Sequence, residues 1–500
     1  MRIRLHDLLA GAADSPALTY RDETVSYPEL RREVRARGSG LGRLLDRGDR
    51  VAVYLDKRIE TVTAIFATSY AGGVFVPVNP VLRAKQVAYI LADCDVRVLI
   101  TTADRLESLR DELEQVKSLW QVIVVGSPEW EALTGDDEPV TGVDVDVAAI
   151  LYTSGSTGRP KGVVLSHRNL LAGAESVSSY LELTDSDVVL AALPLSFDAG
   201  FSQLTTSFAV GAHVVLVNYL LPRDVVRLCT RHGVTALTCV PPLWIQLAEQ
   251  TWPEETGRAL RLFANTGGRM PRTTLDRLRS IFPAARPFLM YGLTEAFRST
   301  YLDPSQVDRR PDSIGRAIPN AEILVVRPDG SVCDPGEEGE LVHRGALVAL
   351  GYWNDPQRTA ERFRPLPGAE GALLPEPAVW SGDSVVRDEE GFLYFVGRTD
   401  DMIKTSGYRV SPTEIEEVVF GTGLVRDAVA LGLPDDKLGH RIVLIVSPAG
   451  AELDVDALRA ALKKDLPIYM LPKDIQVRPE LPRSPNGKFD RNLLRAEVSS

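Results

Sequence analysis

The chain has 500 residues, more than one hydrophobic core usually organises, so we expect a large domain with a smaller companion or three subdomains. Hydrophobic residues make up 44% and charged residues 25%, which indicates a globular protein rather than a disordered one. The formal net charge of −12 argues against nucleic acid as a partner, although a small polyphosphate needs only a local pocket of donors and Mg²⁺.

The N-terminal stretch and the cysteines predict a cytoplasmic protein without a membrane span. In MRIRLHDLLAGAAD, His6 and Asp7 interrupt an apolar part that is too short for a signal peptide. The longest apolar stretch, residues 208–221, contains His213 and Asn218 and lacks the ~20 uninterrupted apolar residues of a membrane span. The cysteines are far apart and show no metal-ligand spacing, so we expect buried free thiols. They are Cys94, Cys229, Cys239 and Cys333.

Short β-branched runs alternate with amphipathic stretches through the first half of the chain. Continuous apolar runs of this kind are typical of strands that are buried on both faces of a sheet, and they predict an α/β fold. The runs are RVAVYL (50–55), VRVLIT (96–101), QVIVVG (121–126), VVLAALPL (188–195), HVVLVNYLL (213–221) and TALTCVP (235–241).

The segment LYTSGSTGRPKGVVLSH (151–167) predicts a phosphate-binding loop. An apolar run leads into a loop rich in Ser, Thr and Gly, and a second apolar run follows. Successive backbone N–H groups and hydroxyls of such a loop can surround phosphate oxygens, while Lys161 supplies a cation. The segment is not a Walker loop, in which Ser or Thr follows the Lys, because Gly162 stands there. A surface turn, the alternative, would not need this density of small donors.

The pattern of residues changes twice in the rest of the chain. After about residue 315, Asp-Gly, Pro-Gly and Glu-Gly pairs interrupt strand-like runs, which predicts a β-rich subdomain over about 315–399. After GRTDD (397–401) the pattern predicts a compact α+β module. We therefore expect a large N-terminal domain over 1–399, with two buried α/β sheets and the β-rich subdomain, and a small mobile domain over 400–500.

Nine strings in a fixed order resemble the superfamily of acyl-CoA synthetases, peptide-synthetase adenylation domains and firefly-type luciferases. Besides the phosphate loop they are GGVFVPVNP (72–80), YGLTEA (291–296), GELVHRG (339–345), GYWNDPQRTAERF (351–363), WSGD (380–383), GRTDDMIKTSGYRVSPTEIE (397–416), LPIYMLP (466–472) and SPNGKFDR (484–491). The resemblance covers nearly the whole chain. It implies an enzyme that uses ATP and Mg²⁺ to activate a carboxylic acid as its acyl-adenylate and then transfers the acyl group to a thiol.

The resemblance assigns an ATP and Mg²⁺ site to several of these strings. It implies that Tyr291 contacts the adenine, Thr294 the α-phosphate and Glu295 the metal, for which a carboxylate oxygen is a suitable ligand. Asp383 has acceptors for the ribose diol, and Arg398 has donors for the ribose or phosphate. Without the family match, these charged residues would be assigned to the surface. The other expected nucleotide-binding residues are Thr153, Ser154, Gly155, Ser156, Thr157, Gly158, Lys161, Gly267 and Gly268.

In the resembled enzymes the small C-terminal domain rotates between an adenylating pose and a thiol-transferring pose. The hinge position falls on Asp400, and the segment with Lys404 and Gly407 is implied to approach the site in the second pose. Lys488 matches the lysine that enters the site in the first pose and stabilises charge on the phosphorus oxygens. The chain ends twelve residues after Lys488 without a carrier module. The expected acceptor is therefore an acyl or peptidyl carrier protein in trans, or CoA.

The residues that would line the acid pocket suggest an amino acid. Amino-acid activators commonly have Phe-Asp where this chain has Phe197 and Asp198, and the Asp pairs with the substrate ammonium. Arg298 falls on a lining position that is usually apolar or small, where it would suit a second carboxylate. Together these residues favour an amino-dicarboxylic acid of the aspartate type. The remaining expected lining residues are Ser202, Thr266, Met290 and Ser299.

Several alternatives stay open. Asp198 could be the N-cap of a helix that continues into AGFSQL, and Arg298 could pair with Asp198 or another acidic side chain and face away from substrate. The chain could instead be an acyl-CoA ligase for a fatty, aryl or small carboxylic acid, or a nucleotide-binding regulator that has lost catalysis. It resembles freestanding enzymes that load β-amino acids or aspartate-type precursors in macrolactam biosynthesis, and also AMP-forming ligases associated with exosortase systems.

Overall fold

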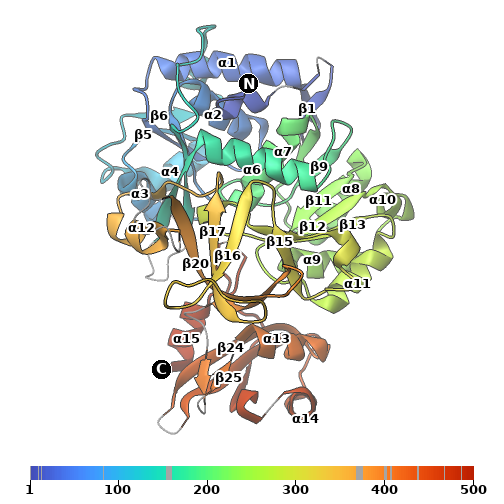
Figure 1. Ribbon diagram of the computed structural model, residues 1–500. Helices are drawn as coiled ribbons and strands as arrows, with labels where there is room; N and C mark the ends of the chain where they lie inside the picture. Colours follow the sequence, from blue (N-terminus) through green and yellow to red (C-terminus); the bar gives the residue numbers. More distant parts are fainter. Residues whose placement is uncertain are drawn as a thin grey trace.

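The larger part of the molecule contains the N-terminus, and the residues after about 400 form a smaller part below it (Figure 1). The computed structural model describes residues 2–9, 11–12, 14–82, 84–153, 160–366, 376–398, 403–405, 408–410, 412–435, 438–466, 468–485 and 487–499.

The first sheet of the larger part has seven strands within the described chain, in the order β18-β8-β7-β4-β3-β5-β6. These strands are β3 (Arg50–Tyr54), β4 (Val74–Pro77), β5 (Val96–Thr101), β6 (Gln121–Val124), β7 (Val147–Thr153), β8 (Lys161–Ser166) and β18 (Gly351–Tyr352). Strands β3 to β7 run parallel, whereas β8 and β18 are antiparallel to their neighbours. The helices between and after the parallel strands are α2 (Ile59–Tyr70), α3 (Ala84–Asp93), α4 (Ala103–Leu113) and α5 (Pro128–Glu131).

The second sheet has fourteen strands in the part of the chain that is described, and five of the twelve pairings along its path are parallel. Its parallel strands are β1 (Pro16–Tyr20), β10 (His213–Leu216), β9 (Val188–Ala191), β11 (Ala236–Cys239), β12 (Leu262–Asn265) and β13 (Arg286–Tyr291), with β2 (Glu23–Ser26) antiparallel at the edge. The helices around it are α1 (Tyr27–Gly42), α6 (His167–Tyr180), α7 (Asp198–Val210), α8 (Pro222–His232), α9 (Pro241–Ala248), α10 (Glu254–Ala259) and α11 (Arg272–Ile281).

Antiparallel strands continue this second sheet beyond β13. They are β14 (Thr300–Leu302), β15 (Ser313–Ala317), β21 (Leu393–Arg398), β20 (Pro377–Arg387), β17 (Glu338–Gly345) and β16 (Ala321–Val326), with β19 (Phe363–Pro365) beside β20 and α12 (Pro356–Arg362) before it. The predicted β-rich region is therefore present. It continues the larger sheet because β14 pairs with the edge of β13, where backbone donors and acceptors would otherwise stay unpaired.

All six predicted strands form, as β3, β5, β6, β9, β10 and β11, so the α/β fold is confirmed. Most of them end before the apolar run does. Strand β9, for example, ends at Ala191, and residues 192–197 leave the sheet to reach α7. A run of apolar letters overestimates a strand here because the loop that follows is also buried.

The smaller part has a five-stranded sheet in its described residues, with helices on both faces. Alternate residues of β24 face opposite ways, so Ala430 packs in one core with Leu458, while Leu431 packs in another with Leu494. The expected boundary at 399/400 and the hinge position Asp400 lie outside the described residues. The elements are β22 (Ile403–Thr405), β23 (Tyr408–Val410), β24 (Val425–Asp435), β25 (Gly439–Pro448), β26 (Asp474–Val477), α13 (Pro412–Gly421), α14 (Val455–Asp465) and α15 (Arg491–Ser499).

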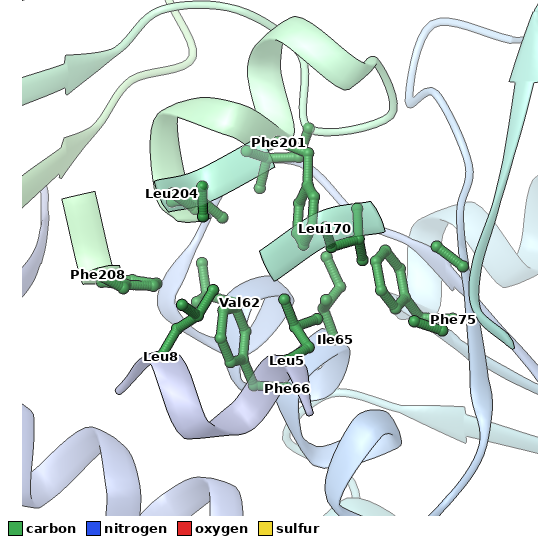
Figure 2. Close-up of a cluster of buried hydrophobic side chains, with 14 of the residues drawn as sticks. Leu5, Leu8, Val62, Ile65, Phe66, Phe75, Leu170, Phe201, Leu204 and Phe208 are labelled. Carbon is green, nitrogen blue, oxygen red and sulfur yellow. The ribbon is translucent and has the colours of Figure 1, made fainter. Parts of the chain in front are cut away.

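A continuous apolar core holds α7 in place. The short 3₁₀ helix η1 (Leu5–Leu8) buries Leu5 and Leu8 against side chains from α2, α6 and α7 (Figure 2). Within it the rings of Phe66 and Phe208 meet edge to face at 5.4 Å between centroids. Full burial of such a side chain contributes about 1.5–3 kcal/mol. The core therefore fixes the direction of α7, whose first residue is Asp198.

Lys57 connects the two sheets. It lies in the loop after β3, and its ammonium donates hydrogen bonds to the carbonyls of Ala191, Ala192 and Leu193 at 2.9, 2.8 and 3.1 Å. Its backbone N–H donates to Oδ1 of Asn218, and its carbonyl accepts from Nδ2 of the same residue. Burial lowers the pKa of Lys57 to about 7, while three carbonyl acceptors favour the charged form. The end of β9 is thus fixed to the first sheet.

None of the helices in the described ranges combines the length and the apolar composition that crossing a lipid bilayer requires. All four cysteines are buried and free, as expected. Burial raises the pKa of Cys94 and of Cys229 to about 12, which disfavours the reactive thiolate.

We expect Lys57→Met to lower the free energy of unfolding by about 3 kcal/mol, because buried carbonyls lose their donor. Guanidinium denaturation would measure the change. The exposed Lys85 provides a matched control, and Lys85→Met should stay within about 0.5 kcal/mol of the unmodified protein. Equal midpoints for the two variants would contradict the role of Lys57 as a connection between the sheets.

Candidate active site

The predicted phosphate loop connects two antiparallel strands. Thr153, the last residue of β7, lies opposite Lys161, the first residue of β8. The strand ends therefore bring the expected cation to the start of the loop. The loop residues expected to bind phosphate, however, lie outside the described residues. They are Ser154, Gly155, Ser156, Thr157 and Gly158.

Helix α3 anchors both ends of this loop. The hydroxyl of Tyr152 donates to Oδ2 of Asp93 at 2.5 Å, on the side where the loop begins. The hydroxyl of Tyr89 donates to the carbonyl of Pro160 at 3.2 Å, on the side where it ends. The two ends of the loop therefore keep a fixed position relative to the first sheet.

Lys161, Glu295 and Tyr352 form a compact polar cluster between the two sheets. The ammonium of Lys161 lies 2.9 Å from Oε1 of Glu295 and donates to the hydroxyl of Tyr352 at 2.6 Å. That hydroxyl donates to the same carboxylate oxygen at 2.6 Å, and the ammonium lies 4.2 Å from the centre of the Tyr352 ring. Glu295 is buried, in the short 3₁₀ helix η2 (Thr294–Ala296), so its charge depends on these partners.

The cluster keeps Glu295 ionised. Burial raises the pKa of this carboxyl, but the charges of Lys161 and Arg362 and the hydrogen bond from Tyr352 outweigh burial and lower the pKa to about 2. No group of three or more His, Cys, Asp or Glu residues in the described chain could hold a metal ion alone. Mg²⁺ is commonly held by one or two carboxylates together with substrate phosphates, and an ionised Glu295 fits that requirement.

A second cluster joins the end of β13 to β20. The hydroxyl of Tyr291 donates a hydrogen bond to Oδ2 of Asp383. Asp383 lies opposite Arg398 in the pairing of β20 with β21. Asp383 and Arg398 therefore lie on adjacent strands, and the Tyr291 side chain reaches Asp383 from β13 of the same sheet, although 107 residues separate Tyr291 from Arg398 along the chain.

Asp198 and Arg298 form a buried ion pair. Nη1 of Arg298 lies 2.9 Å from Oδ2 of Asp198, and only 2% of the arginine side chain is exposed. The same nitrogen donates to the carbonyl of Phe297 at 2.7 Å, while the buried Nε has no hydrogen-bond partner among the described residues. Asp198 is the first residue of α7 and Phe197 occupies the N-cap position, so the N-cap alternative is wrong. The other alternative, a pairing of Arg298 with Asp198, is what the structure contains.

Arg298 forms one wall of a small internal cavity. The volume in which the centre of a water molecule can lie is about 20 Å³, so the cavity holds about one water molecule. Most of the other walls are apolar side chains from α6, α7, β9, β11 and β12, but Ser202 and Met290 also line it. Two expected substrate residues thus lie beside Arg298. A third, Ser299, is fully buried with its hydroxyl 2.9 Å from Nδ1 of His343.

Phe297 gives the segment between Glu295 and Arg298 a strained turn. Its φ and ψ are 58° and −62°, and the N–H of Arg298 donates to the carbonyl of Ala296 at 2.6 Å, which defines a γ-turn with positive φ. A buried aromatic residue rarely adopts this conformation. The ring is held where Gly173 of α6 leaves space, because a Cβ there would come within 2.6 Å of it.

The remaining expected residues lie at the margin of these clusters or beyond them. Lys488 is exposed in a turn in which its carbonyl accepts from the N–H of Ser484, and in the described structure its ammonium contacts none of the residues above. Its expected entry into the site stays a prediction. Thr294 is half-buried, Thr266 is buried at the end of β12, and Gly267 and Gly268 are exposed after it. Lys404 lies in β22, whereas Gly407 is outside the described residues.

Two residues of the site were missed by sequence reasoning. Tyr352 and Arg362 both lie in the string GYWNDPQRTAERF, which marked the family but carried no assigned role. Tyr352 is 191 residues from Lys161 along the chain, so no local spacing indicates their contact. The only sequence signal for these two residues was the string itself, which contains a tyrosine and several arginines.

Two family models match the chain. The model described as AMP-binding enzyme matches residues 6–353, and the model described as AMP-binding enzyme C-terminal domain matches residues 414–488. Among curated proteins, the chain is 32% identical to Delta-poly-L-ornithine synthetase of Acinetobacter baumannii over 98% of this chain, yet spans only 36% of that protein. It is 31% identical to Feruloyl-CoA synthase of an Amycolatopsis species, over 96% of this chain and 95% of that one.

Solved structures agree over nearly the full length. The structure of ATP-bound MatB from Rhodopseudomonas palustris has a TM-score of 0.89 at 26% identity, with 99% of each chain covered. O-succinylbenzoate Coenzyme A Synthetase from Bacillus subtilis, in complex with ATP and magnesium ion, has a TM-score of 0.85 at 27% identity, with 100% of each chain covered. Both similarities include the larger and the smaller part.

We expect the contribution of Glu295 to stability to disappear in acid. Its folded pKa of about 2 lies below the usual 4.5, so the ionised form stabilises the fold above pH 4.5 and this stabilisation is lost as pH falls toward 2. Glu295→Gln should therefore lower the unfolding temperature at pH 6, and the difference from the unmodified protein should shrink between pH 4.5 and 3. Glu249→Gln, at an exposed position, should show little difference throughout. A constant deficit for Glu295→Gln down to pH 3 would contradict this account.

Proposed function

Because this chain belongs to the family of AMP-binding enzymes, AMP-forming acid–thiol ligases that use ATP with Mg²⁺, we propose that its acid is an amino-dicarboxylic acid of the aspartate type. The product would be an aminoacyl-AMP, and the aminoacyl group would pass to the phosphopantetheine thiol of a separate carrier protein. The adenylation chemistry follows from the family, whereas the acid and the acceptor are proposals.

The buried pair of Asp198 and Arg298 is the single observation that carries the choice of acid. A buried charge is stable only with a partner, so a ligand that separates this pair must restore both interactions. A substrate ammonium would pair with Asp198, and a second substrate carboxylate would pair with Arg298. The unpartnered Nε of Arg298 offers an additional donor for such a carboxylate. An amino-dicarboxylic acid meets both requirements at once.

The size of the cavity supports a short substrate. The cavity beside Arg298 has room for about one water molecule, which is less than an alkyl chain would occupy. Ser202 and Met290 close this end from α7 and β13. A long fatty acid would have to displace several buried side chains.

Each cluster has a role in the proposed adenylation. Tyr291 and Asp383 would hold the nucleoside, with the carboxylate accepting from ribose hydroxyls. Lys161 and the phosphate loop would neutralise phosphate charge, and Glu295 would hold Mg²⁺, which polarises phosphoryl oxygens when bound. The ammonium of Lys488 would then reduce the repulsion between the attacking carboxylate and the α-phosphate. Asp198 and Arg298 would orient the acid for this attack.

One observation favours the second candidate, an acyl-CoA ligase for an uncharged small acid. Asp198 and Arg298 pair with each other, so the pair could act as a closed wall of the pocket. In that case neither residue would contact the acid, and CoA would be the acceptor.

We expect ATP–pyrophosphate exchange to be supported by aspartate or 3-methylaspartate, with alanine slower by about 10⁴ because it would leave Arg298 buried and unpaired. Arg298→Met should remove the preference for the diacid, while Arg309→Met, at an exposed position, should leave it unchanged. Exchange with octanoate equal to or above that with the amino acids would end the amino-acid proposal.

Lys488→Ala should reduce ATP–pyrophosphate exchange by about 10²–10³, the loss typical of one preorganised stabiliser of transition-state charge. The unfolding temperature should not change, since the side chain is exposed. Lys473→Ala, another exposed lysine of the smaller part, is the control and should retain full exchange. Normal exchange in Lys488→Ala would show that this lysine does not reach the phosphate.

A further inference from the structure

Arg362 is the last residue of α12, and the structure holds this helix end firmly against β18. The N–H of Tyr352 donates to Oγ1 of Thr359 at 2.9 Å, and the rings of Tyr352 and Phe363 meet at 5.4 Å between centroids. Gly351 allows the close approach, since a Cβ there would lie 2.7 Å from Thr359. The backbone that carries Arg362 is therefore fixed beside the cluster of Lys161, Glu295 and Tyr352.

A glycine in the string WSGD makes room for the guanidinium. Gly382 has φ of +66°, and a Cβ at this position would lie 2.8 Å from Nη1 of Arg362. The next residue is Asp383, which receives the hydrogen bond from Tyr291. Arg362 thus reaches from α12 to the strand that carries the expected ribose-binding carboxylate.

Arg362 has no carboxylate partner in the described chain. No described acidic side chain forms an ion pair with it, and its Nε is buried without a hydrogen-bond partner there. The nearby carboxylate of Glu295 is already bonded to Lys161 and Tyr352. A partly buried cation that shares one carboxylate with a second cation is incompletely neutralised, so an anionic ligand at this point would be stabilised.

Arg362 lies beside the cluster. The next residue, Phe363, packs on the ring of Tyr352, whose hydroxyl is bonded to both Lys161 and Glu295. Two cations therefore face one carboxylate, and the surplus positive charge lies where the resemblance expects polyphosphate.

From this geometry we propose that Arg362 is a substrate-contacting residue whose guanidinium donates to phosphate oxygens of ATP beside Lys161. A guanidinium suits this role because its planar fork matches two phosphate oxygens at once. The proposal rests on the adenylation chemistry of the family and is independent of the acid that the enzyme activates. Gly382 serves the same interaction by leaving space for the side chain.

Isothermal titration with Mg²⁺-ATP and with adenosine, in the absence of any acid, tests this assignment. Arg362→Gln should weaken ATP binding by about 10- to 100-fold and leave adenosine binding unchanged, because only ATP carries phosphate. Arg362→Lys should fall between this variant and the unmodified protein, since it keeps the charge but loses the fork. Arg358→Gln, on the same helix and paired with Asp355, is the matched control and should bind ATP normally.

Unchanged ATP affinity in Arg362→Gln would overturn the proposal. Equal losses for ATP and adenosine would also overturn it, because they would indicate that Arg362 only supports the fold around Tyr352. The unfolding temperature of each variant without ligand identifies misfolded protein, and Arg362→Lys then provides the test. Since no acid is present, either result leaves the amino-acid proposal untouched, and failure of that proposal leaves this one intact.

Discussion

The ion pair between Lys161 and Glu295 joins the two sheets of the larger part at the place where the chemistry is expected. Lys161 begins β8 in one sheet, and Glu295 follows β13 in the other. Because Glu295 is buried, its charge requires a partner, and the placement of the two sheets must satisfy that requirement. Tyr352 reinforces the pair from a third segment of the chain. Segments from both sheets are thus held around one carboxylate.

The segment from Glu295 to Arg298 joins two buried ion pairs. Only two residues separate Glu295 from Arg298, yet one side chain faces Lys161 and the other faces Asp198. The γ-turn at Phe297 produces this divergence, and burial of the Phe297 ring sustains its unfavourable backbone conformation. One turn thus fixes the directions of both the Glu295 and the Arg298 side chains.

The smaller part has hydrophobic cores of its own, separate from those of the larger part. Its sheet has apolar cores on both faces, so it does not need the larger part to bury its side chains. A polar contact, the ion pair of Arg269 with Glu417 of α13, connects the two parts. Polar contacts between domains can be exchanged for water at little cost, which is compatible with the rotation that we expect from the resemblance.

The amino-acid sequence alone determined the family and the α/β fold, and it singled out Lys161 and Glu295 as candidate site residues, since apolar runs and motif strings are local patterns. Only the tertiary structure decided that Arg298 meets Asp198, 100 residues away, and that Tyr352 and Arg362 join Glu295. It also decided that the β-rich strands extend the larger sheet instead of forming their own. These contacts depend on strand order and on the direction of buried side chains, which residues close in sequence do not encode.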